Sequence, residues 1–391
     1  MTGKERLDAA LNFTEADRVP FDLGGTSVST ITKTAFRNAM KHRCHTELGV
    51  IPHDIDPIQQ IVFPDRKTIQ ALGIDTQRFG LPRLFGEATG PVEINGILKL
   101  TDQFNCDWQF DPSQDFYYNQ SSSPLKEYET IDEGLPDYTF PTLAGRKQEV
   151  YQALDAQLPG TQGTQGLVLD RNCAGLTEVA FRIRGYEQFF MDMALDPAGA
   201  EKLLDRILAY KLEYWTVFSA YVLEHKLESK AVVAVECDDL GTQYSLLFSP
   251  EMLKRIVMPR QKILIQHIKQ CLPGIKVLYH SDGAIFELIP QLIDMGVDAL
   301  NPVQFTAAGM DLKLLKKEFG SQLCFWGAGI DTQDTLPHGT PETIREEVKR
   351  NLDILSPGGG FVFTTVHNVQ ADVPPENFWA LWDAFMESSS Y

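Results

Sequence analysis

The second half of the chain alternates short apolar runs with longer amphipathic segments. The runs that favour strands are GLVLD (166–170), AVVAVECDD (231–239), KVLYH (276–280), ALNPVQ (299–304), QLCFWGAGID (322–331) and GGGFVFTTVHN (358–368). Such runs are apolar on both faces, which is typical of parallel strands covered by helices on both sides. Together with a strand near residue 20, at least six strand–helix units predict a closed (β/α)₈ TIM barrel. The open, doubly wound alternative is disfavoured because no GxGxxG follows the first strand.

The first part of the chain is less regular and predicts an N-terminal extension with hairpin and loop insertions. A helix near residues 3–12 precedes RVPFDLGG, which indicates a short strand and a glycine turn. Residues 90–110 alternate like a hairpin, and 111–165 favour loops around a helix near 145–157. We therefore expect one domain over residues 1–391. In it, 1–120 would hold N-terminal helices, the first strand and the hairpin, and 165–388 the regular β/α units.

Charge and cysteine usage narrow the classes of partner. The 391-residue chain has a formal net charge of −18, whereas nucleic acids and anionic membranes require a basic surface, so we expect neither as a partner. No apolar run approaches the roughly 20 residues that span a bilayer, and the start, MTGKERLDAALNF, lacks a signal-peptide core. Six cysteines without CxxC pairs indicate reduced thiols and a cytoplasmic protein. The oligomeric state stays open, a homo-oligomer included.

Polar residues stand where nearly every predicted strand ends. In a parallel barrel these carboxyl ends form the active-site face. From them we select Glu236, Asp238, His280 and His367 as catalytic candidates. The candidate substrate-binding residues are Asp22, Arg171, Asp282, Asn301, Gln304, Asp331 and Asn368.

Structural alternatives stay open for several of these residues. The alternative for Glu236 is one half of a structural ion pair, and for Asp238 or Asp282 it is a turn-capping group. Asp331 would hold a loop. Arg171 would either pair with a carboxylate or meet an acidic substrate, and the sequence does not decide between the two.

Three of the candidates have the composition of a catalytic metal site. Glu236, His280 and His367 would supply two nitrogens and one oxygen, which suits zinc with an open coordination position. The same donors suit iron or manganese, so zinc is a preference. The ligands would come from separate strands, because the sequence has no compact HExxH spacing between them.

Several long segments resemble the uroporphyrinogen decarboxylase superfamily. They are SPEMLKRIVMPRQKIL (249–264), KVLYHSDGAIFELIPQLIDMGVDALNPVQ (276–304), FWGAGID (325–331) and LSPGGGFVFTTVHNVQADVPPENFWALWDAF (355–385). The resemblance runs from about 165 to 388 and implies a (β/α)₈ barrel. It also implies one of two chemistries: cofactor-free decarboxylation of a porphyrinogen, or methyl transfer to or from a corrinoid protein, usually with zinc.

Two departures from the family's patterns separate these chemistries. The decarboxylase branch has an arginine-rich segment after its first strand, where this chain reads RVPFDLGGTSVST (18–30). The thiol-methylating branch holds zinc through an H-x-C motif and a later cysteine. Here those places read His280-Ser281-Asp282 and Pro357-Gly358-Gly359, so both thiolates are missing. A harder donor set remains, which activates oxygen better than sulfur.

The resemblance and these departures favour an O-demethylase component. We expect a methyltransferase that moves a methyl group from a methoxylated small molecule to the corrinoid of a corrinoid-binding protein, with zinc or an acid group activating the leaving oxygen. Two alternatives remain. One is a metal-free decarboxylase of a substrate smaller than a porphyrinogen. The other is an inactive barrel that binds a small molecule, because a fold does not determine a function.

Overall fold

The centre of the molecule is a curled parallel sheet. The computed structural model describes residues 1–43 and 55–391, so Cys44 lies outside the described residues. Seven strands pair in the order β14-β13-β12-β11-β10-β9-β4, all parallel. Their bounds are β4 (Thr76–Phe79), β9 (Gly166–Leu169), β10 (Ala231–Cys237), β11 (Lys276–His280), β12 (Ala299–Asn301), β13 (Cys324–Ala328) and β14 (Phe361–Thr364).

Residues 19–22 close this sheet into a barrel. Phe21 forms a parallel bridge with Phe363 of β14, and the amide of Asp22 donates to the Phe363 carbonyl at 2.9 Å. On the other side, the amide of Asp75, next to β4, donates to the Phe21 carbonyl at 2.8 Å. This segment therefore takes the eighth position, as predicted for the strand near residue 20. The (β/α)₈ barrel architecture predicted from the sequence is confirmed.

The barrel interior is a layer of buried apolar side chains. Its core consists of Val168, Val233, Val235, Leu278, Ala299, Cys324, Trp326 and Val362 from the strands. Helix α1 (Gly3–Leu11) adds Leu7, Ala10 and Leu11 to the same cluster and so covers one end of the barrel. The opposite, carboxyl end of the strands is left for polar groups, as in other barrels of this class.

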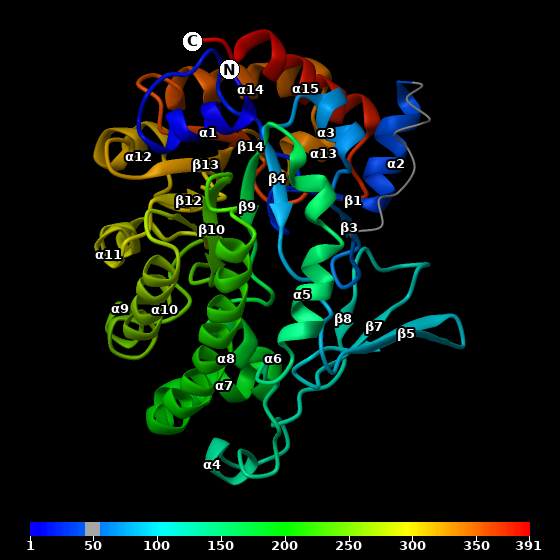
Figure 1. The fold of residues 1–391 in the computed structure, drawn as a ribbon, viewed down its shortest axis with the longest axis vertical. Helices are drawn as coiled ribbons and strands as arrows, with labels where there is room; N and C mark the ends of the chain where they lie inside the picture. Colours follow the sequence, from blue (N-terminus) through cyan, green and yellow to red (C-terminus); the bar gives the residue numbers. More distant parts are fainter. Residues whose placement is uncertain (44–54) are drawn as a thin grey trace.

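Helices alternate with the strands and cover the outside of the barrel (Figure 1). They are α6 (Leu176–Arg184), α7 (Tyr186–Leu195), α8 (Pro197–Glu224), α9 (Pro250–Met252), α10 (Met258–Cys271), α11 (Ile289–Met295), α12 (Leu312–Phe319), α13 (Thr335–His338), α14 (Pro341–Leu355) and α15 (Pro375–Ser388). Capping side chains begin two of them: Asp196 accepts from the Gly199 amide at the start of α8, and Ser249 accepts from the Met252 amide at the start of α9. Among the described residues, no helix is both long and apolar enough to cross a bilayer.

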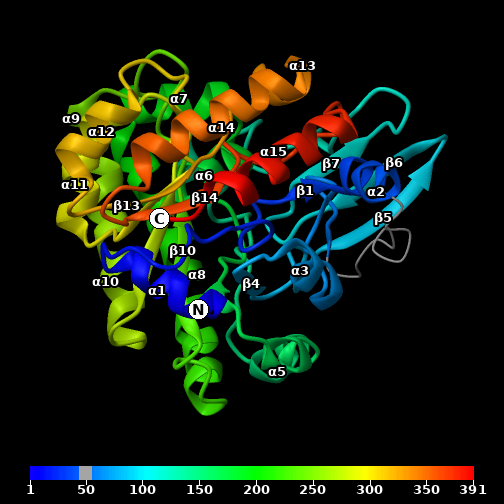
Figure 2. The ribbon, with the colours of Figure 1, turned by 90° about the horizontal axis from the view of Figure 1, so that it is seen from above.

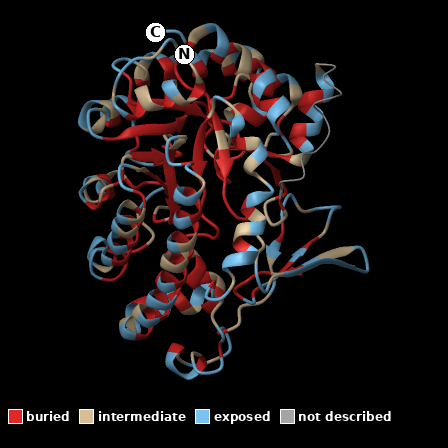
Figure 3. Ribbon diagram, in the orientation of Figure 1, coloured by how far each residue is buried: buried red, intermediate tan, exposed pale blue. Residues whose placement is uncertain are grey.

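The insertions form a separate layer beside the barrel mouth. An antiparallel sheet of β5 (Thr89–Ile94), β6 (Ile97–Thr101), β7 (Asp107–Phe110) and β8 (Asn119–Gln120) extends the predicted hairpin to four strands. Figure 3 shows the barrel strands as buried, whereas the tip of this sheet is exposed.

The remaining elements are shorter. They are β1 (Ile31–Thr32), α2 (Lys33–His42), β2 (Ile55–Asp56), β3 (Ile61–Val62), α3 (Arg66–Leu72), α4 (Ile131–Gly134) and α5 (Lys147–Asp155). Figure 2 shows α2 on the side of the barrel where the β5–β8 sheet lies. Strands β1, β3 and β2 form a small antiparallel sheet of their own.

Barrel closure depends on the buried carboxylate of Asp75, which gives a first prediction. It accepts from the Phe21 amide at 2.8 Å and from Arg18 at 2.7 Å, and Arg6 contacts it at 3.0 Å. Substitution Asp75→Ala leaves these donors without a partner, so we expect the free energy of unfolding in urea to fall by about 3 kcal/mol. The control Asp17→Ala removes a half-exposed partner of Arg6, and we expect it to cost less than about 1 kcal/mol. Equal losses for the two variants would contradict this role of Asp75.

Candidate functional site

The register of three neighbouring strands brings their last residues to one level. Cys237 of β10 pairs with His280 of β11, and His280 pairs with Asn301 of β12. Parallel strands that end at the same level present these residues at one rim of the barrel. The stretch that follows β11 then adds Asp282, and the loop after β14 adds His367.

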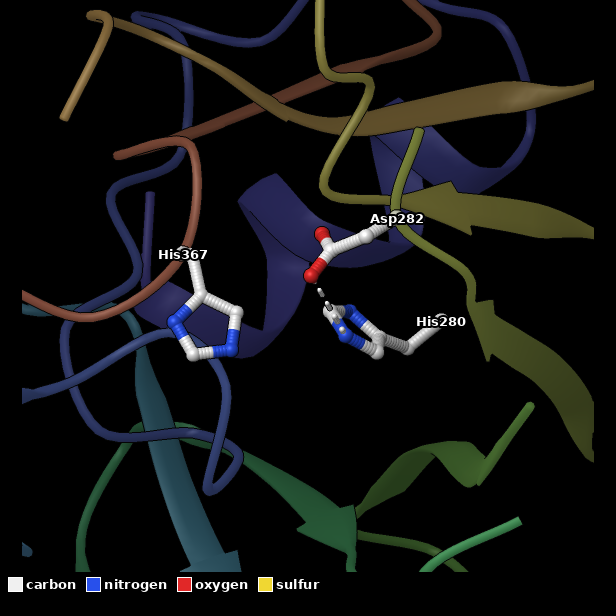
Figure 4. Close-up of side chains that lie close together, drawn as sticks. All are labelled: His280, Asp282 and His367. Atoms are coloured by element: carbon white, nitrogen blue, oxygen red, sulfur yellow. Dashed lines mark ion pairs between the residues drawn. The ribbon is translucent and has the colours of Figure 1, made fainter. Parts of the chain in front are cut away.

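His280, Asp282 and His367 converge at this rim (Figure 4). Each offers one ligand atom, and the three atoms lie within 4.8 Å of one another. The imidazole centroids are 5.7 Å apart, and Asp282 Oδ2 is 4.0 Å from His280 Nε2. Two nitrogens and one carboxylate oxygen form the predicted type of donor set. The carboxylate, however, comes from Asp282, which the sequence analysis placed among the substrate-binding residues.

Asn301 fixes the orientation of the His280 ring. Its Oδ1 lies 2.6 Å from His280 Nδ1, and its Nδ2 donates to the Trp326 carbonyl at 2.7 Å. Because the amide NH₂ is used by that carbonyl, Oδ1 faces the ring as an acceptor, and Nδ1 carries the proton. The lone pair is therefore on Nε2, on the side of Asp282 and of Asp239, whose Oδ1 is 3.5 Å away. Such a partner on the other ring nitrogen is typical of metal-binding histidines.

Both histidines are held in the neutral state near pH 7. Burial lowers the pKa of each to about 4. Neutral imidazole is the form that binds a metal or accepts a proton. His367 also has a left-handed backbone, with φ of 71°, which costs a non-glycine residue roughly 1–2 kcal/mol. The loop stabilises this conformation through a hydrogen bond from Thr365 Oγ1 to the His367 carbonyl at 2.5 Å, and strain of this kind is concentrated at functional sites.

A cavity of about 390 Å³ opens above these histidines. The barrel mouth supplies one wall, and the insertion layer supplies the other. The lining residues with functional side chains are Asp56, Arg83, Asp102, Trp108, Tyr118, Arg171, Cys173, Glu178, Arg182, Tyr186, Asp239, His280 and His367. The volume is at the small end of the range for small-molecule sites, about 300–1,000 Å³. Charges of both signs line it.

Glu236, predicted as the third ligand and as a catalytic group, does not join this cluster. Its carboxylate lies 2.8 Å from Lys211 Nζ and accepts from Trp215 Nε1 at 2.6 Å, both on α8. The neighbour Val235 belongs to the barrel interior, and successive side chains of a strand point to opposite faces. Glu236 therefore points outward, into the layer between strand and helix. The ligand set is corrected accordingly, with Asp282 in place of Glu236.

Asp238 caps a helix. Its buried carboxylate accepts from the Thr177 amide and hydroxyl, at 3.0 and 2.5 Å, and from Gln261 Nε2 at 2.8 Å. Burial, and then the charge of Glu178, raises the pKa of Asp238 to about 7. These contacts occupy the carboxylate at the start of α6, which is the turn-capping alternative rather than the catalytic one.

Asp22 and Asp331 are also occupied by internal contacts. Asp22 accepts from Thr76 Oγ1 at 2.6 Å and from Trp326 Nε1 at 2.7 Å, and it is fully buried. Asp331 accepts from the amides of Gln333 and Asp334, at 3.1 and 2.9 Å. Neither lines the cavity, so the expectation that they bind substrate is replaced by structural roles at the barrel's strand ends.

Gln304 and Asn368 hold the loops that carry the cluster. Gln304 Oε1 accepts from the amide of Gly283, the residue after Asp282, at 2.8 Å. Asn368 follows His367 in the sequence, and its Oδ1 accepts from the Thr30 amide at 2.8 Å. Together with Asn301, these two residues position neighbouring groups, although the sequence analysis expected all three to contact substrate. Of that expected group, Arg171 lines the cavity itself.

The cavity also contains charged residues that the sequence analysis missed. Glu178 and Arg182 are four residues apart on α6, and both line the cavity. Arg182 lies over the Trp108 ring at 5.2 Å from its centroid. The sequence signal for these two residues was an E-x-x-x-R pair on the helix that follows β9. Such pairs are common on solvent-facing helices, so the pair did not indicate a cavity. Asp239 was visible as a strand-end carboxylate and was not selected.

The structural role of Glu236 leads to a second prediction. Substitution Glu236→Leu leaves Lys211 buried without its counter-charge, and we expect the free energy of unfolding to fall by about 3 kcal/mol. The double variant Glu236→Leu/Lys211→Met removes both charges, and most of that loss should be recovered in urea unfolding. Asp353→Ala, which removes one partner of the exposed pair with Lys349, is the control and should change stability by less than about 0.5 kcal/mol. A single Glu236 variant as stable as the unmodified protein would contradict the ion-pair assignment.

Comparison with known proteins identifies the family. The family described as uroporphyrinogen decarboxylase (URO-D) matches residues 173–388, more than half of the chain. The uroporphyrinogen decarboxylase of Chlorobium luteolum is 24% identical over 201 residues, 51% of this chain and 52% of that protein. That of Legionella pneumophila is 28% identical over 200 residues, 49% of this chain and 54% of that protein. The chain thus spans about half the length of the curated relatives it matches.

A solved structure extends the likeness of fold to the whole chain. A methyltransferase from Methanosarcina mazei superposes with a TM-score of 0.64 and 16% identity, covering 99% of both chains. At this identity the likeness concerns the fold, which includes the N-terminal part that the family match leaves out. The chain belongs to the uroporphyrinogen decarboxylase family, as its C-terminal motifs indicated.

Proposed function

We propose that the protein is a corrinoid-dependent methyltransferase that takes a methyl group from a methoxylated small molecule. The observation that carries this proposal is the convergence of His280, Asp282 and His367, of which the two histidines line a small cavity. In this reaction the bond between methyl carbon and ether oxygen breaks, the methyl group passes to the reduced corrinoid of a partner protein, and the oxygen leaves as an alcohol or phenol. The leaving oxygen needs stabilisation because an alkoxide or phenoxide is a poor leaving group.

The three converging side chains are suited to hold zinc. Their donors are nitrogen and oxygen, both imidazoles are neutral, and Asn301 orients one of them. Zinc is usually four-coordinate, so three protein ligands would leave one position open for substrate. When bound, the metal would supply Lewis acidity toward the ether oxygen. Because no cysteine in the described part of the chain belongs to the cluster, the set favours an oxygen substrate over a thiol.

The surrounding residues have their own tasks in this proposal. Trp108 and Tyr118 of the insertion layer offer apolar faces that would pack against an organic ring. Tyr186 lines the same cavity while 63% of its surface is exposed, so the cavity reaches solvent at this point. Access from outside is required, because the methyl acceptor would be carried by a second protein, a corrinoid-binding protein.

One observation favours a second candidate function. Arg83, Arg171 and Arg182 line the cavity, although the arginine-rich segment of the decarboxylase branch is missing from the sequence. A decarboxylase acting on a small carboxylic acid would use such arginines to bind its substrate. The absence of a metal requirement and the release of carbon dioxide would distinguish this activity from methyl transfer.

The metal assignment gives a third prediction. We expect the purified protein to bind one zinc ion per chain, and His280→Ala and His367→Ala each to weaken zinc affinity at least about 100-fold. A chelator competition with a zinc-sensitive dye measures this. His338→Ala replaces an exposed histidine of α13 and should keep the affinity of the unmodified protein. Retention of zinc by both cluster variants would exclude this site.

The reaction gives a fourth prediction. Purified protein, zinc and chemically reduced cob(I)alamin should convert a methoxylated aromatic compound to its phenol and form methylcobalamin, followed by absorbance and mass spectrometry. Removal of the metal with a chelator should stop the reaction, and added zinc should restore it. Metal-independent release of carbon dioxide from a small carboxylic acid, without methylcobalamin, would instead establish the decarboxylase function.

A further inference from the structure

Arg171 is a buried cation with unused donors. Only 5% of its surface is exposed, and it lines the cavity. Its Nε and Nη1 atoms have no hydrogen-bond partner among the described residues. Buried guanidinium groups are normally satisfied by several acceptors, because an unpaired buried charge is costly. Because Arg171 lines the cavity, its unpaired donors point to an acceptor that arrives with a ligand.

The nearest acid, Asp170, is committed to other arginines. Its Oδ2 accepts from Arg78 Nε at 2.7 Å and lies 3.4 Å from Arg83 Nη2. Arg171 Nη1 is 3.8 Å from Asp170 Oδ1, beyond hydrogen-bonding distance. One carboxylate thus faces three guanidinium groups, and Asp56 lies 3.3 Å from Arg83 rather than beside Arg171. This corner of the cavity keeps an excess of positive charge.

The other carboxylates of the cavity are also engaged. Asp102 accepts from Trp108 Nε1 at 2.9 Å. Glu178 accepts from the Gly175 amide at 2.9 Å and from Cys237 Sγ at 3.3 Å. Asp239 accepts from the Asp282 amide at 3.1 Å. None of them is hydrogen-bonded to Arg171, so the excess positive charge beside Arg171 is not cancelled by a direct contact.

Arg171 shares its cavity with the two histidines of the cluster. Arg171, His280 and His367 all line the same space of about 390 Å³. A ligand held by Arg171 would therefore have its remaining atoms within the same small cavity as the two imidazoles.

We propose that Arg171 binds a carboxylate of the substrate, so that the methyl donor is a methoxylated carboxylic acid small enough for a 390 Å³ cavity. The proposal rests on the proposed methyl transfer for the identity of the methoxy group, but the binding of the carboxylate does not depend on it. An ionised carboxylate forms charge-assisted hydrogen bonds with a guanidinium, which are stronger than neutral ones. A carboxylate at Arg171 would orient the methoxy group toward the histidine cluster, so Arg171 is a binding and positioning residue.

Binding can be tested without turnover. Isothermal titration calorimetry on the zinc-loaded protein would compare 2-, 3- and 4-methoxybenzoate and methoxyacetate with their methyl esters, which keep the methoxy group and lose the charge. We expect at least one acid to bind about 10- to 100-fold more tightly than its ester. This comparison uses the unmodified protein, so its result does not depend on the folding of a variant. Equal affinity for each acid and its ester, or no binding of any acid at millimolar concentration, would overturn the proposal.

Variants then locate the contact. Arg171→Met should abolish the preference for acid over ester, Arg171→Lys should retain part of it, and Arg350→Met, at a half-exposed arginine of α14, should leave it unchanged. Thermal unfolding of each variant controls for folding. A preserved preference in folded Arg171→Met would overturn the assignment of this residue. A carboxylate that binds at Arg171 but gives no methylcobalamin would refute the proposed methyl transfer and leave the binding site established.

Discussion

The site depends on the in-register parallel pairing of β10, β11 and β12. That pairing sets His280 beside Asn301, and the 2.6 Å contact between their side chains fixes which ring nitrogen carries the proton. A shift of one residue would turn His280 to the opposite face of the barrel wall. Leu278, two residues earlier, lies in the barrel interior, so the alternation that buries Leu278 also directs His280 toward the mouth. Packing and chemistry are therefore specified by the same register.

The same alternation explains why Glu236 and Asp282, from two neighbouring strand ends, have different roles. Glu236 follows the inward-facing Val235 and points to α8, where Lys211 and Trp215 receive it. Asp282 lies beyond the last residue of β11, where the chain is no longer constrained by the pleat, and it turns back toward His280. Glu236, within its strand, is thus drawn into the wall, whereas Asp282, beyond the end of β11, is available to the site.

Much of the fold was predictable because it follows from local pattern. Apolar runs located six of the seven strands of the central sheet, whereas β4 was missed because Thr76–Phe79 is not an apolar run. The ligand set was only partly predictable. When a strand is apolar on both faces, its sequence does not show which residues face the barrel interior, so nothing in AVVAVE indicates on which side Glu236 lies. The cavity wall was not predictable: Trp108 and Arg182 meet in space although 74 residues separate them, and only the packed insertion layer brings them together.

Net charge and local charge act at different ranges, which reconciles an acidic protein with an anionic ligand. The total of −18 is spread over the surface, where salt screens it beyond roughly 8 Å at physiological ionic strength. Inside the cavity screening is weaker, and a ligand there responds mainly to the groups it touches. Three guanidinium groups share Asp170 at that point, and Arg171 keeps its open donors. A polyanion approaching the molecule would meet the whole acidic surface, whereas a small molecule with one carboxylate would meet chiefly Arg171. For the proposed carboxylate ligand, this charge distribution would favour a small acid over a polyanion.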